Sequence, residues 1–133
     1  MDLFEKIAWD GSPLAYIIRR ELTPSATTFL TPPDFTQQIG FVVYPAGGEI
    51  TPHLHRSFER KIQGTSEVLV VKKGRCEVTI YNDLKEPVAK RELREGDILL
   101  LVDGGHGFRM SEDTILLEIK QGPYTGLDEK ERF

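Results

Sequence analysis

The three histidines of the chain are the residues with the clearest capacity for chemistry. His53 and His55 form a His-x-His pair, and His106 follows the turn-forming run Asp103-Gly104-Gly105. On a β-strand, residues two apart project from the same face, so the pair would place two imidazoles side by side. At that spacing both imidazole nitrogens can reach a single ion at ~2.0–2.2 Å. Burying the two rings without partners would cost ~1–3 kcal/mol each, so the pattern favours metal or ligand binding over a structural role.

The elements that must position these histidines are expected to be strands. The chain has 133 residues and a mass of 15.1 kDa, which predicts a single domain over residues 1–133 with one core. It contains 28 β-branched residues (Ile, Val and Thr) against 5 alanines. β-Branched residues favour strands over helices, and the sequence therefore predicts an all-β fold.

Ten short apolar stretches, bounded by turn residues, are expected as strands, and a polar tail, residues 121–133, follows them. The stretches are Tyr16–Ile18, Thr27–Leu30, Ile39–Tyr44, Glu49–His55, Ser66–Lys72, Arg75–Tyr81, Pro87–Leu93, Ile98–Val102, Gly105–Met110 and Thr114–Lys120. The His-x-His pair would end the fourth of them. The following stretch, Arg56–Thr65, is longer than a hairpin needs, and we expect it to border the mouth of the site.

The charge balance excludes some classes of partner. Seventeen basic and twenty-one acidic residues give a net charge of −4, which argues against electrostatic binding to nucleic acid or anionic lipid. No stretch has the length of a transmembrane helix, and the first ten residues lack the apolar run of a signal peptide. We therefore expect a cytoplasmic protein. The single cysteine, Cys76, allows neither an intrachain disulfide nor a cysteine-based zinc site.

Several expected strands are apolar on both faces, among them Phe41–Tyr44, Val68–Val71 and Leu99–Val102. One face can cover the core of the domain, and the other must be covered by a second sheet layer or by a second chain. Pairing of two copies about a twofold axis is the commonest way to cover such a face, so the pattern predicts a homodimer.

Two segments resemble the two motifs of the cupin superfamily. In the first, Gly47 is followed after five residues by His53 and His55, and Glu67 is followed after six by Gly74. Eleven residues separate His55 from Glu67, where the family has three or four. In the second, Gly96 and Gly104 match, whereas Val102 replaces the family's Pro, His106 comes one residue early and Met110 replaces its Asn. The runs around His106 and Tyr124 also resemble a subgroup of small bacterial cupins, some of them like proteins found among sugar and surface-polysaccharide genes.

The resemblance implies a cupin-type double-stranded β-helix, or jelly-roll barrel, with motif 1 at about 47–74 and motif 2 at about 96–110. It also implies that His53, His55, Glu67 and His106 bind one divalent metal ion. Glu59, separated from His55 by three residues, has the family's short spacing and is the alternative carboxylate. We favour Glu67, because an insertion in the preceding loop leaves its place on its strand unchanged.

Three neutral imidazoles and one carboxylate suit Fe, Mn, Co, Ni or Zn, and the sequence does not choose among these metals. We expect a small polar ligand, sugar-like or carboxylate, and the candidate ligand-binding residues are Arg60, Lys61, Phe108, Met110 and Tyr124. Two kinds of function fit: a metal-dependent enzyme (an isomerase, an epimerase or, with iron, a dioxygenase) or a non-catalytic binding or sensor protein. No catalytic residue is assigned.

Overall fold

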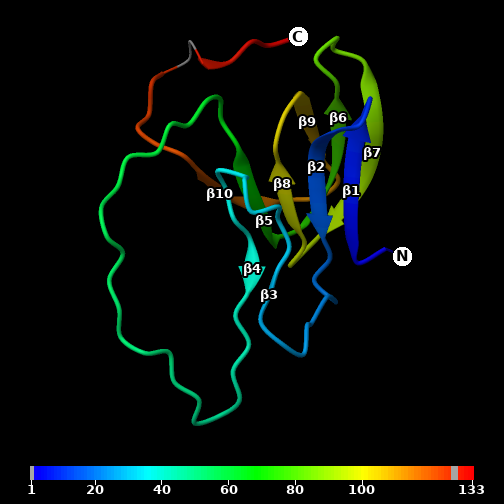
Figure 1. Ribbon diagram of the computed structural model, residues 1–133. Helices are drawn as coiled ribbons and strands as arrows, with labels where there is room; N and C mark the ends of the chain where they lie inside the picture. The colour runs from blue at the N-terminus through cyan, green and yellow to red at the C-terminus, as the bar shows by residue number, and fades with distance from the viewer. Residues whose placement is uncertain (1, 127–128) are drawn as a thin grey trace. The chain divides into compact units, whose positions relative to one another are not determined.

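The structure is a computed structural model that describes residues 2–126 and 129–133 (Figure 1). Its strands form antiparallel β-sheets. The chain divides into two units. Unit 1 takes its described residues from 1–22 and 65–133, and unit 2 consists of residues 23–64. No helix in the described part of the chain has the length and hydropathy that spanning a bilayer requires.

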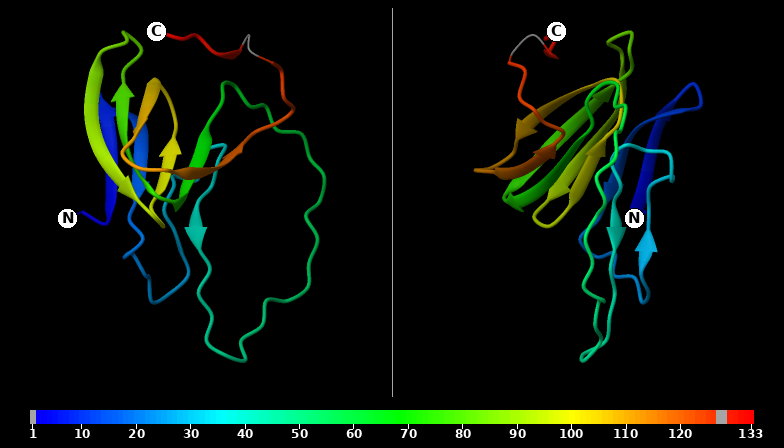
Figure 2. Two further views of the ribbon diagram at one scale, coloured as in Figure 1. Left: turned by 180° about the vertical axis from the view of Figure 1, so that it is seen from behind. Right: turned by 60° about the vertical axis from the view of Figure 1, so that its left-hand side comes forward.

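Unit 1 contains two sheets, whose strands can be followed in Figure 2. The five-stranded sheet has the order β1-β2-β8-β5-β10, and the three-stranded sheet has the order β7-β6-β9. Their bounds are β1 Phe4–Trp9, β2 Ser12–Ile18, β5 Glu67–Lys73, β6 Arg75–Tyr81, β7 Pro87–Arg94, β8 Ile98–Leu101, β9 Gly105–Met110 and β10 Ile115–Lys120. All neighbouring strands are antiparallel.

The core of unit 1 is built by residues from both sheets, as in a β-sandwich. Alternate residues of β5 (Leu69, Val71) and of β6 (Cys76, Val78, Ile80) belong to the same buried cluster. Cys76 is fully buried there as a small apolar side chain. The prediction of an all-β fold is confirmed. The described strands of unit 1 form two sheets and no closed barrel.

Unit 2 is largely irregular. Its two strands are β3 (Thr28–Phe29) and β4 (Gly40–Phe41), which pair with each other. The expected strand Glu49–His55 is wrong, because residues 42–66 contain no strand. Pro52 lies in the middle of that stretch, where it cannot donate a ladder hydrogen bond, and the segment is exposed rather than half-buried.

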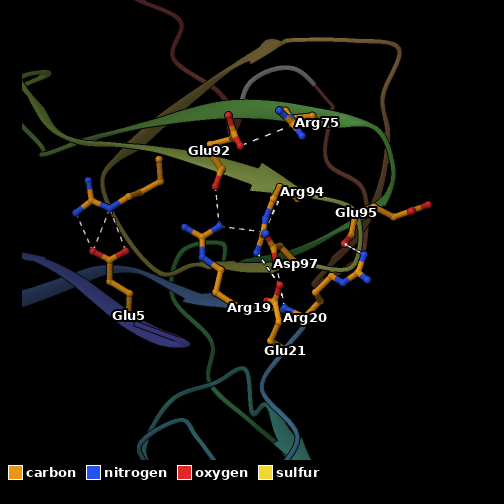
Figure 3. A network of polar contacts seen from close by, with 10 residues as sticks. Glu5, Arg19, Arg20, Glu21, Arg75, Glu92, Arg94, Glu95 and Asp97 are labelled. Carbon is orange, nitrogen blue, oxygen red and sulfur yellow. Dashed lines mark hydrogen bonds and ion pairs between the residues drawn. The ribbon is translucent and has the colours of Figure 1, made fainter. Parts of the chain in front are cut away.

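A buried carboxylate ties the turn between β7 and β8 to the end of β2 (Figure 3). Asp97 is 0% exposed and accepts hydrogen bonds from Arg19 Nη1 (2.9 Å), the Arg20 amide (3.0 Å) and the Arg94 amide (2.9 Å). Arg19 is also buried, and its Nη1 donates to the Glu92 carbonyl at 2.6 Å. Removing one partner of a buried ion pair is strongly destabilising, because it leaves the other charge buried and uncompensated.

Candidate functional site

Glu67 lies within an expected strand, and its side chain is on the core-facing side of β5. It is the first residue of that strand, two positions before the buried Leu69, and it pairs with Lys120 of β10. Burial, followed by the hydrogen bond with Glu118 and the charge of Glu118, raises the pKa of the Glu67 carboxyl to about 7. The positive charges of Lys120 and Lys130 oppose this increase without cancelling it. Near neutral pH this group therefore exchanges between its acid and carboxylate forms.

His106 is the second residue of β9, opposite Ile80 of β6. Phe108, two residues on, packs against the core, and its ring lies 5.9 Å from that of His106. The imidazole keeps access to solvent, yet desolvation lowers its pKa, with Lys130 acting in the same direction and Glu118 against it. The neutral form, which is the form that binds metal, is thereby favoured.

Glu118 is the residue that sequence reasoning missed. It lies on β10, opposite Leu69, with a side chain 44% exposed, and its Oε2 is 3.8 Å from Lys120 Nζ. It contacts Glu67 and acts electrostatically on His106. The period-2 pattern could have found it, because it follows Leu116, which packs against the core, on the same face of an expected strand.

His53 and His55 lie together in the irregular chain of unit 2, with ring centroids 5.3 Å apart. The strand that should have aligned them is absent, so their proximity comes from the local path of the chain. His53 Nδ1 is 2.8 Å from the Thr51 carbonyl oxygen. A carbonyl only accepts, so this contact places the hydrogen on Nδ1 and leaves the Nε2 of the neutral ring as a free acceptor.

The remaining predicted residues, apart from Phe108, are exposed. Glu59, Arg60 and Lys61 are exposed in unit 2, where the Arg60 guanidinium lies 4.1 Å from the centroid of the Phe58 ring. In unit 1, Met110 is 49% and Tyr124 76% exposed.

The predicted metal ligands are thus divided, with His53 and His55 in unit 2 and Glu67 and His106 in unit 1. Within neither unit do the described residues contain three or more His, Cys, Asp or Glu side chains grouped to hold a metal. A hollow of about 300 Å³ in unit 1 contains none of the expected residues and is lined by Trp9, Asp10, Ser12, Leu14, Asp83, Leu84 and Asp103.

The raised pKa of Glu67 predicts a pH-dependent stability of the metal-free protein. The folded state holds this proton up to about pH 7 and the unfolded state only to about 4.5, so its contribution to stability falls as pH rises between these values. The pKa of His106 is lowered, so the contribution of His106 to stability rises with pH at values below its usual pKa. Because the two effects oppose each other, only a comparison of variants isolates the contribution of Glu67. We expect the free energy of unfolding of Glu67→Gln, relative to that of the wild type, to increase from about pH 5 to about pH 8. Urea titrations in excess chelator measure this, and parallel pH profiles would show that Glu67 has no such role.

Comparisons with protein-family models, with curated proteins and with solved structures found no match to this chain.

Proposed function

We propose that the protein is a small metal-binding cupin, in which His53, His55, Glu67 and His106 hold one divalent ion beside a small polar ligand. The observation that carries this proposal is the pair of adjacent imidazoles of His53 and His55 in unit 2. Unit 1 offers two further donors of the right kind, the core-facing carboxylate of Glu67 and the imidazole of His106. On this proposal the two sheets of unit 1 belong to a jelly-roll fold.

The chemistry of the donors suits such an ion. The hydrogen bond from His53 Nδ1 to the Thr51 carbonyl leaves Nε2 free to bind an ion, and desolvation lowers the pKa of His106, which favours its neutral ring. At Glu67, burial and Glu118 raise the pKa by more than Lys120 and Lys130 lower it, so the carboxylate form is not fully compensated. A bound cation would supply the missing positive charge. Three imidazoles and a carboxylate suit Fe, Mn, Co, Ni or Zn. When bound, the ion would polarise a carbonyl or hydroxyl group of the ligand.

The ligand we propose is sugar-like or a carboxylate. Arg60 and Lys61 are cationic and exposed, which suits an anionic group, and Phe108, Met110 and Tyr124 offer apolar surface. A screen of sugars and small carboxylic acids by thermal shift, on metal-loaded and chelator-treated protein, tests the proposal. A ligand that stabilises only the metal-loaded form supports it, and equal stabilisation of both forms contradicts it. Turnover of such a ligand would distinguish an enzyme from a sensor.

We also propose that the protein is a homodimer. The outer face of β10, the edge strand of the five-stranded sheet, exposes Ile115, Leu117 and Ile119 by 56, 51 and 48%. Such a row of apolar side chains on an edge strand suits pairing with a second copy. We expect light scattering to give the mass of a dimer for the wild type and of a monomer for Leu117→Glu. Leu84→Glu, at a turn residue 66% exposed, is the matched control and should remain dimeric. A monomeric wild type contradicts this proposal.

A further inference from the structure

Three turns of unit 1 border the hollow that contains none of the expected site residues. They are the β1–β2, β6–β7 and β8–β9 turns, and Figure 1 shows all three at the end of these strands that is uppermost in the view. The volume of the hollow, about 300 Å³, is at the lower end of the range of small-molecule sites in proteins. Turns gathered at one end of a β-sandwich are a common place for binding, because the sheets hold them in position.

Hydrogen bonds fix the walls of this hollow. The amides of Val102 and Asp103 both donate to the Leu14 carbonyl, at 2.9 and 3.2 Å, so the β8–β9 turn is held to β2. In the β6–β7 turn the buried Asn82 side chain accepts a hydrogen bond from the Leu84 amide at 3.0 Å. The hollow is therefore formed before a ligand binds, which reduces the entropy that binding would cost.

The polar part of the lining is acidic. Asp10, Asp83 and Asp103 come one from each turn, all three are exposed, and no lysine or arginine lines the hollow. None of these carboxylates takes part in an ion pair with a residue in the described part of the chain. Lys85, in the β6–β7 turn, pairs instead with Glu131, at 2.8 Å between Nζ and Oε1. Three uncompensated negative charges around one hollow, in a chain of net charge −4, would attract a cation.

The rest of the lining indicates what kind of cation fits. Among the described residues no three acidic, histidine or cysteine side chains are grouped closely enough to hold a metal ion, so the carboxylates suit a larger cation. Trp9 and Leu84, both exposed, give the hollow apolar surface as well. An ammonium group can lie against an indole ring and donate charge-assisted hydrogen bonds to carboxylates. A chain of methylene groups that carries several ammonium groups would use both kinds of surface.

We infer that this hollow binds an aliphatic polyamine, with its ammonium groups at Asp10, Asp83 and Asp103 and its methylene groups against Trp9 and Leu84. None of the proposed metal ligands lines the hollow, so this inference does not depend on the proposed function.

Titration with spermidine, followed by tryptophan fluorescence, tests the inference, because Trp9 is the single tryptophan of the chain and lines the hollow. We expect a saturable change in emission, and calorimetry should give one spermidine per chain. Asp10→Asn and Asp83→Asn retain the shape of the side chain but remove its charge, and each should weaken binding about fivefold or more. Asp113→Asn, at an exposed position in the turn before β10, removes the same charge and should leave the affinity unchanged.

Several outcomes would overturn the inference. One is the absence of a saturable change in the emission of the wild type, and another is unchanged affinity in Asp10→Asn and Asp83→Asn. An equal loss in Asp113→Asn would show that only the net charge matters. Glucose and Mg²⁺ at matched ionic strength are the ligand controls, and a response to either as strong as that to spermidine would assign the hollow to a neutral ligand or to unspecific attraction of cations. Circular dichroism of each variant verifies that the sheets are formed.

Discussion

Replacing His106 by alanine is expected to lower the affinity for a divalent ion more than about 100-fold, beyond the loss typical of groups that only support a ligand. The fold should persist, because the imidazole keeps access to solvent and the core is formed by other residues. Calorimetric titration measures the affinity, and thermal unfolding in chelator measures the stability, which should change by no more than about 0.5 kcal/mol. Unchanged affinity would remove His106 from the site.

The same titration ranks the two candidate carboxylates. Glu67→Gln should weaken metal binding strongly, whereas Glu59→Gln should leave it close to the wild-type value. Glu59 is exposed in the irregular part of unit 2, whereas Glu67 is held on the core-facing side of β5. The reverse order would identify Glu59 as the ligand.

The second large effect concerns stability. Asp97→Ala should reduce the free energy of unfolding by about 3–5 kcal/mol, because it leaves the buried Arg19 without its carboxylate partner. Two backbone amides, those of Arg20 and Arg94, lose an acceptor at the same time. Urea unfolding measures the change. Glu95→Ala removes an exposed acid two residues away and should alter stability by no more than about 0.5 kcal/mol. A loss in Asp97→Ala as small as that would show that the network stabilises nothing.

Much of the sheet structure follows from local pattern. The strands Arg75–Tyr81 and Gly105–Met110 have the predicted bounds, because their apolar residues alternate clearly and turns flank them. The strand Phe4–Trp9 was missed because Glu5 and Lys6 obscure its alternation. The following Asp10-Gly11 turn, with both residues at positive φ, was the available signal.

The expected strand that ends at the His-x-His pair is absent for a different reason. The segment from Glu49 to His55 shows alternation, but Pro52 removes a donor, and none of the described strands pairs with it. Strand pairing is a long-range property that local sequence does not contain. Glu118 was missed for a related reason, since its partner Glu67 lies on another strand and only the register brings the two together.

Metal binding by the wild-type protein is the most direct test of the central claim. Chelator-treated protein is titrated with Co(II), Mn(II) and Zn(II), and the bound ion is then counted per chain by elemental analysis. We expect one ion per chain, with binding lost as pH falls through about 7, where Glu67 takes up its proton. Chains that bind none of these ions, or that bind one equally well after His53 and His106 are both replaced by alanine, would contradict it.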